Sequence, residues 1–150
     1  MQFQHDDAES SVFAASYPLD GRYERPVKLF KADPDLLAGV EPAMARLLRH
    51  RGSVDSTVLT KGDWTPPAAE ELGRGAIGLL VIEGLLSRTI RFAGLESAEL
   101  VGAGDLLRPW DDEPDASLEF AADWRVLEHA TIAILDDRFA GRICRVPGER

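Results

Sequence analysis

The hydrophobic and polar positions of residues 79–110 follow a pattern that predicts consecutive β-strands. Residues 79–82 are apolar at every position, which is typical of a strand covered on both faces, and Glu83-Gly84 after them favours a bulge or a bend. From Leu86 onward, apolar residues recur at every second position, with Arg88 as the exception. This period of two indicates a half-buried strand rather than a helix.

Glycines divide the residues that follow into two turns and one further strand. Ala93-Gly94 predicts a tight turn, and residues 97–101 then form the second strand. The run Gly102-Ala103-Gly104-Asp105 ends that strand in another turn. The pattern therefore predicts strand, bulge, strand, tight turn, strand and glycine turn, followed by a loop.

Helices are predicted before this stretch. Asp33 followed by Pro34 is a helix start, with the aspartate as N-cap and the proline in the first turn. A second helix is predicted to begin at Glu41-Pro42 and to end at Gly52. Residues 53–59 are rich in β-branched side chains and predict a strand.

The remaining segments complete a chain of short elements. Residues 61–64 and Pro66-Pro67 have the composition of turns, and residues 68–75 predict one short helical turn. Residues 124–135 return to strand character, and Asp136 caps a last helix. Several short strands at close spacing, with helices at both ends, predict a β-barrel or jelly roll with helical covers.

This order of elements resembles the cyclic-nucleotide-binding domain that forms the N-terminal sensor of Crp/Fnr-type bacterial transcription regulators. The matching parts are the apolar strand ending in Glu83-Gly84 and the turn Gly104-Asp105-Leu106-Leu107. The resemblance extends over about residues 33–139. It implies a mainly β fold, a double-stranded β-helix (a jelly roll like that of cyclic-nucleotide-binding domains) with flanking N- and C-terminal helices.

Three parts of the chain are expected on this basis. Residues 1–32 are an N-terminal extension without a lasting hydrophobic period, expected to be loosely packed. Residues 33–143 are the sensor domain, and residues 144–150 are a tail or the start of a dimerisation helix. In full-length regulators of this type that helix leads into a helix-turn-helix domain, which this sequence lacks.

Composition and charge narrow the choice of function. With 150 residues, 45% hydrophobic and 29% charged, the chain fits one globular domain. Its 17 basic against 26 acidic residues give a net charge of −9, so the chain by itself is not expected to bind DNA. The single Cys144 excludes an internal disulfide and fits the cytoplasm. No apolar run is long enough to span a membrane, and no signal peptide is evident.

The resemblance also says what a ligand site would need. Cyclic-nucleotide binders of this family have a Gly-Glu pair for the ribose and a later arginine for the phosphate. Here Arg108-Pro109 occupies the first place, and Phe120 to Asp123 contain no arginine at the second. Seven acidic residues against one arginine lie between Asp105 and Asp123, and they would repel a phosphate. Conventional cyclic-AMP binding is therefore not expected.

Arginines and large apolar residues near the glycine turn and on the long strands are the candidate ligand-binding residues. They are Leu106, Leu107, Arg108, Trp110, Arg88, Trp124 and Arg125. The arginines are candidates for contacting an anion, and the leucines and tryptophans for lining an apolar pocket. The alternative is that the arginines form surface ion pairs and that the tryptophans pack the end of the barrel.

The sequence thus predicts an effector-sensing regulatory domain and no enzyme, with no cofactor and no metal. The expected partners are a small-molecule effector and a second copy of the chain, with DNA reached only through a helix-turn-helix domain. One alternative is a ligand-free jelly roll that serves dimerisation or protein interaction. A cupin-type enzyme is a further alternative, but His5, His50 and His129 lack the spacing of a metal site.

Overall fold

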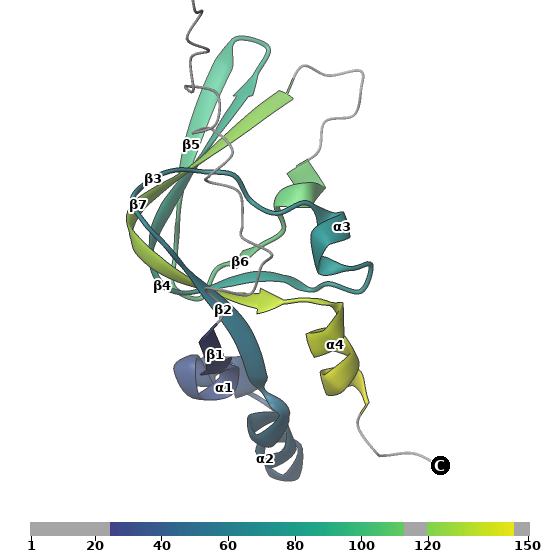
Figure 1. Ribbon diagram of the computed structural model, residues 1–150. Coiled ribbons are helices and arrows are strands. Elements are labelled where there is room, and N and C mark those ends of the chain that lie inside the picture. The colour runs from purple at the N-terminus through teal and green to yellow at the C-terminus, as the bar shows by residue number, and fades with distance from the viewer. Residues whose placement is uncertain (1–24, 113–119, 146–150) are drawn as a thin grey trace, which may run out of the picture.

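The computed structural model describes residues 25–112 and 120–145, and within them the chain is mainly β (Figure 1). Seven strands of these residues form one antiparallel sheet. The strands are β1 (Arg25–Lys28), β2 (Ser53–Leu59), β3 (Gly62–Trp64), β4 (Gly78–Phe92), β5 (Leu95–Gly102), β6 (Leu106–Leu107) and β7 (Phe120–Leu135). The α-helices are α1 (Leu29–Ala32), α2 (Pro42–Arg51), α3 (Ala69–Leu72) and α4 (Asp137–Cys144), and the 3₁₀ helices are η2 (Pro34–Leu37) and η3 (Pro109–Asp112).

The sheet is built on its two longest strands, β4 with 15 residues and β7 with 16. Its strand order is β1-β2-β7-β4-β5, with β3 added to β7 and β6 added to β4. The register of β4 against β7 shifts between Val81 and Leu86, where the sequence predicts a bulge at Glu83-Gly84. That prediction is confirmed. Gly84 has a φ of +104°, and a Cβ there would lie 2.5 Å from the carbonyl oxygen of His129.

The bulge divides both long strands into halves with different neighbours. The first half of β4 lies between β6 and the second half of β7. The second half of β4 lies between β5 and the first half of β7. On its other side, β7 pairs with β3 through its first half and with β2 through its second half. Both long strands curve strongly, and the β4–β5 hairpin extends away from the helices (Figure 1).

The predicted burial of residues 79–82 on both faces is confirmed for the first three of them. Leu79 and Val81 are 1% and 0% exposed and belong to an interior core that also contains Trp64, Leu86, Leu107 and Trp124. Leu80, 2% exposed, belongs to a second core on the opposite face, where helices α1, α2 and α4 pack. An uninterrupted apolar run is required because each face has its own cover.

Residues 25–32, expected to belong to a loosely packed extension, are packed into the domain. β1 pairs with β2, and Leu29 and Phe30 of α1 are buried in the second core. Gly52 makes room for this packing, since a Cβ at that position would overlap the Phe30 ring. The domain therefore includes residues 25–32, because the apolar side chains of α1 complete its helical core. The rest of the expected extension lies outside the described residues.

Of the three predicted helix starts, those at Glu41-Pro42 and Asp136 are confirmed. The Glu41 carboxylate accepts hydrogen bonds from the backbone N–H groups of Ala43 and Met44 at the start of α2. The Asp136 carboxylate accepts one from Phe139 at 2.8 Å at the start of α4. Asp33 makes no side-chain cap, and the segment after it is only the short 3₁₀ helix η2.

One predicted turn is confirmed, and another is wrong. Ala93 and Gly94, with φ of +49° and +77°, form the tight turn between β4 and β5 as predicted. The turn predicted over residues 61–64 is wrong for Gly62–Trp64, which form β3 and pair with β7. Trp64 lies in a strand of the sheet because its ring packs against the ring of Trp124.

Among the helices that the structure describes, none has the length and apolar character needed to cross a membrane.

Candidate functional site

The structure places the seven candidate residues in two separate regions. Arg88, Trp124 and Arg125 lie on the second half of β4 and the first half of β7. The other four, Leu106, Leu107, Arg108 and Trp110, lie on β6 and around η3. The two regions border different hollows, so these residues do not form one site.

A row of four side chains crosses the sheet in the first region. Trp64, Trp124, Arg88 and Glu99 are direct neighbours on β3, β7, β4 and β5. The two indole rings meet edge to face, with centroids 5.8 Å apart. The Arg88 guanidinium lies 5.7 Å from the Trp124 centroid, and its Nε is 3.0 Å from Oε1 of Glu99. Both tryptophans are buried in the interior core.

This row explains why an arginine interrupts the apolar alternation of β4. Arg88 has the same parity as Leu86, so its side chain lies on the face of the interior core, and that side chain is only 21% exposed. Removing a cation from water costs free energy, and the contacts of Arg88 with the Trp124 ring and the Glu99 carboxylate offset this cost. Arg88 therefore differs from the surface arginines of the chain.

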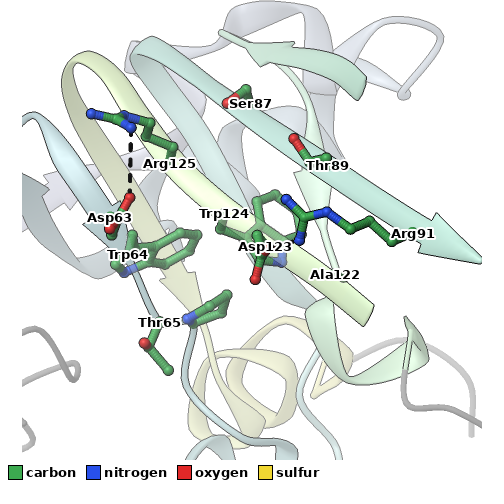
Figure 2. Close-up of a pocket in the computed structure, with 11 residues that line it drawn as sticks. Asp63, Trp64, Thr65, Ser87, Thr89, Arg91, Ala122, Asp123, Trp124 and Arg125 are labelled. Carbon is green, nitrogen blue, oxygen red and sulfur yellow. Dashed lines mark hydrogen bonds and ion pairs between the residues drawn. The ribbon is translucent and has the colours of Figure 1, made fainter. Parts of the chain in front are cut away.

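The opposite face of the same strands carries a polar groove of about 500 Å³, which Figure 2 shows. Ser87, Thr89 and Arg91 lie along β4 on one side of it, and Asp123 and Arg125 lie on β7. Asp63 and Trp64 of β3, with Thr65 and Pro66 after it, contribute to the far side. Arg125, a candidate for an inward arginine, is here on the outer face of the sheet.

The charges of this groove are paired. Arg125 is 3.9 Å from Asp63, an ion pair marked by the dashed line in Figure 2. Arg91 is hydrogen bonded to Asp123 and, at 2.8 Å, to Glu96. The hydrogen bonds to Asp123 and then to Glu96 raise the pKa of Arg91 above its ordinary value. Both arginines that line the groove are engaged by carboxylates, so the groove offers an anion no arginine that lacks an ion pair.

A second hollow of about 560 Å³ lies in the other region, between α3, the segment that follows it, and η3. Arg108 and Trp110 line it, and the guanidinium of Arg108 lies 5.5 Å from the Trp110 ring centroid. Arg108 is fixed by two partners: its Nη1 donates to the carbonyl of Ile77 at 2.8 Å and its Nε to Asp111 at 2.7 Å. Two of the candidate residues therefore meet at a hollow in a defined geometry.

The two leucines of the candidate set line neither hollow. They are consecutive residues of β6, so their side chains lie on opposite faces. Leu107 is 6% exposed and belongs to the interior core, whereas Leu106 is 47% exposed. Trp110 is half-buried against that core. Of the leucines and tryptophans that the sequence suggests as pocket lining, Trp110 borders the second hollow and Trp124 borders the polar groove.

Sequence reasoning missed three residues that matter at these sites. Glu70 and Arg74 line the second hollow, but the short helical turn predicted over residues 68–75 gives no sign of a site. Trp64 borders the polar groove and the row of four, but the Gly-Asp before it has the chemistry of a turn. Trp64 could not be recognised without its strand pairing, and Glu70 and Arg74 could not be recognised without knowing that α3 lies beside Arg108 and Trp110.

The histidines and the cysteine of the described residues lie away from both hollows. His50 lies on α2, His129 on β7 and Cys144 on α4, all exposed, and none lines a hollow described above. Within residues 25–112 and 120–145, no three His, Cys, Asp or Glu side chains are grouped to hold a metal. What these two places offer is binding through arginines, carboxylates, hydroxyls and indole rings.

No protein-family model matches this sequence, and no curated protein matches it significantly. The function is therefore argued from the strand pairing and from the two hollows.

Proposed function

We propose that this chain is the effector-sensing domain of a Crp/Fnr-type regulator, built on a jelly roll of the cyclic-nucleotide-binding kind. The observation that carries the proposal is the nesting of its strand pairs. β2, β3, β5 and β6, with two halves each of β4 and β7, make eight strand segments. Pairing runs from the innermost hairpin, β4–β5, outward to β2 with the end of β7. A long hairpin folded back on itself in this way is the pattern of a jelly roll.

The turn at Gly104-Asp105 gives further support, because it is built into the roll. Asp105 accepts a hydrogen bond from the Gly102 N–H at 2.8 Å through its carboxylate, and its backbone N–H donates to the Gly102 carbonyl at 3.1 Å. Backbone bonds in both directions join the turn to Val81, at 2.8 and 3.0 Å. The two motifs that carry the family resemblance, the apolar strand and the Gly-Asp turn, are therefore in direct contact.

A sensor also needs a route from its ligand to an output, and α4 provides one. It follows β7 directly, buries Phe139 in the helical core, and donates from Arg142 to the carbonyl of Ser53 at 2.8 Å. In this proposal a ligand that prefers one arrangement of the roll changes how α4 is held. The direction of α4 would then set a dimerisation helix and, through it, DNA binding by a helix-turn-helix domain.

Cyclic AMP is not the effector in this proposal. Arg108-Pro109 stands where the family has its Gly-Glu pair, so a proline replaces the carboxylate for the ribose hydroxyl. The guanidinium of Arg108, in the place of the glycine, is already engaged by Ile77 and Asp111. We therefore assign the sensor a different class of ligand.

Thermal unfolding of the purified chain tests the proposal. The panel contains cyclic AMP, cyclic GMP, other nucleotides and small organic acids at millimolar concentration. A ligand at about 100 times its Kd stabilises the folded state by about 2.7 kcal/mol, which raises the midpoint by several degrees. We expect a rise with a member of the panel other than a cyclic nucleotide. A panel without any rise would argue against a sensor, and a rise with cyclic AMP would overturn the assignment of another ligand class.

One observation favours the alternative of a ligand-free dimerisation or interaction module. β5 is an edge strand, and Leu95 and Leu100 on it are 73% and 67% exposed. Edge strands with exposed leucines are open to pairing with another chain. Sedimentation of the wild type and of Leu100→Lys separates the two ideas. A dimer that dissociates in Leu100→Lys, together with no ligand response, would support the module.

A further inference from the structure

We propose that the second hollow is the effector pocket and that it takes a small aromatic carboxylate, an inference that rests on the proposed sensor function. Its lining comes from three neighbouring segments, α3, the residues after it and η3. The lining residues are Ala69, Glu70, Gly73, Arg74, Ala76, Arg108 and Trp110. A volume of about 560 Å³ lies within the range typical of small-molecule sites.

The apolar side of the pocket suits a flat ring. Trp110 and Ala76 are both partly buried against the interior core, so they form a fixed floor rather than mobile surface groups. The Arg108 guanidinium covers part of the indole at 5.5 Å and is itself fixed by Ile77 and Asp111. An aromatic ring placed here would meet both a π-face and a cation.

The charged side chains of the pocket favour a ligand with one negative charge. Arg74 makes no hydrogen bond or ion pair with the residues that the structure describes, so its guanidinium is available to a carboxylate. Glu70 lies on the same hollow, and Asp111 is joined to Arg108. Because Asp111 already balances Arg108, Arg74 is the arginine of this pocket that is left to balance a bound anion, which suits one negative charge better than the two of a phosphate dianion. Glu70 can in addition accept a hydrogen bond from a hydroxyl group on the ring.

The pocket is also joined to α4. The segment from Gly73 to Ala76 forms one wall, and a Cβ at Gly73 would overlap the carboxylate of Asp137 in the first turn of α4. The Ile77 N–H donates to the carbonyl of Leu135 at 2.8 Å, just before that helix. Arg108 donates to the carbonyl of the same Ile77. A ligand that binds Arg74 and Arg108 would therefore contact the segment that packs against the start of α4.

Isothermal titration calorimetry with 4-hydroxybenzoate tests the pocket. We expect a Kd on the order of 0.1 mM, a typical value for a ligand of this size. 4-Hydroxycyclohexanecarboxylate, which keeps the hydroxyl and the charge but lacks the aromatic ring, and 4-hydroxybenzyl alcohol, which lacks the charge, should each bind at least about tenfold more weakly. Arg74→Gln and Trp110→Leu should weaken 4-hydroxybenzoate by a similar factor, while Trp110→Phe keeps most of the affinity. Arg125→Gln, the same change in the other groove, is the matched control and should leave the Kd unchanged.

The outcomes separate this inference from the sensor function. No heat with 4-hydroxybenzoate in the wild type, or binding that Arg74→Gln and Trp110→Leu leave unchanged, overturns the pocket. The sensor function then stands if another compound of the thermal panel raises the midpoint. For the route to α4, the amide resonances of Asp137 and Phe139 should shift during the titration. If they stay in place while the ligand binds, the link to α4 is wrong.

Discussion

The guanidinium of Arg88 lies 5.7 Å from the ring centroid of Trp124, on the same face of the sheet as the interior core. Because the Arg88 side chain is only 21% exposed, its stem packs on apolar neighbours while its head is shared between Trp124 and Glu99. This contact joins β4 to β7, and the ion pair joins β4 to β5. Arg88 therefore connects three strands at the level where the β4–β5 hairpin extends from the rest of the domain.

Arg88→Ala should destabilise the chain by about 1–2 kcal/mol, because it removes a half-buried cation–π contact, an ion pair and the packing of the stem. Urea unfolding followed by circular dichroism measures the loss. Arg91→Ala is the matched control: it lies three residues further on the opposite face and has two ion pairs, but its side chain is 51% exposed. Its loss should be smaller, since exposed pairs are screened by solvent. Equal losses would mean that the tryptophan contact contributes nothing.

Gly84→Ala should be among the most damaging substitutions in the long strands. Its φ of +104° disfavours any side chain, and a Cβ would lie 2.5 Å from the backbone of His129 and Ala130. The strand must shift to accept it, at a cost of about 3 kcal/mol or more. Gly104→Ala has a similar φ of +90° but no atom within 4 Å, so it should lose only about 1 kcal/mol. Urea midpoints of the two variants compare the overlap with the backbone strain alone.

What the sequence predicted well is what local pattern encodes. The apolar run of residues 79–82 specifies cover on both faces, and Glu83-Gly84 specifies the bulge, because both depend on neighbours in the chain. Burial of Leu79, Leu80 and Val81 and the register shift after Val81 agree with this. The caps at Glu41 and Asp136 are local in the same sense.

The candidate site depended on strand pairing, which no local pattern contains. Trp110 follows β6 and Trp124 lies in β7, yet Trp110 borders the second hollow whereas Trp124 packs in the interior core beside the polar groove. Trp64 was predicted in a turn because three residues of β3 have no period of their own. Its strand conformation comes from pairing with residues of β7 that lie at least 60 positions later in the sequence.

Asp136→Ala should loosen the start of α4. The carboxylate accepts a hydrogen bond from the Phe139 N–H at 2.8 Å, and loss of such a cap costs about 1 kcal/mol. Asp136→Asn keeps an acceptor and should lose much less. Hydrogen exchange at the Phe139 amide reports the cap directly, and it should accelerate in Asp136→Ala alone. Equal exchange in both variants would show that this bond does not hold the helix.

Trp64→Phe should be nearly neutral for stability, unlike most truncations of a buried tryptophan. Trp64 is 8% exposed, and its indole N–H has no hydrogen-bond acceptor among the described residues. A buried donor without an acceptor costs about 1–3 kcal/mol, and phenylalanine removes it. The smaller ring loses a comparable amount in apolar contact, so the two effects offset each other.

Trp124→Phe is the control, because that ring also faces the Arg88 guanidinium and its truncation should cost at least about 1 kcal/mol more. Circular dichroism in urea is the appropriate measurement, since the tryptophan fluorescence itself changes in both variants. A large drop in the free energy of unfolding of Trp64→Phe would contradict this expectation. It would mean that in solution the indole N–H donates a hydrogen bond to water or to a group bound in the polar groove that Trp64 borders.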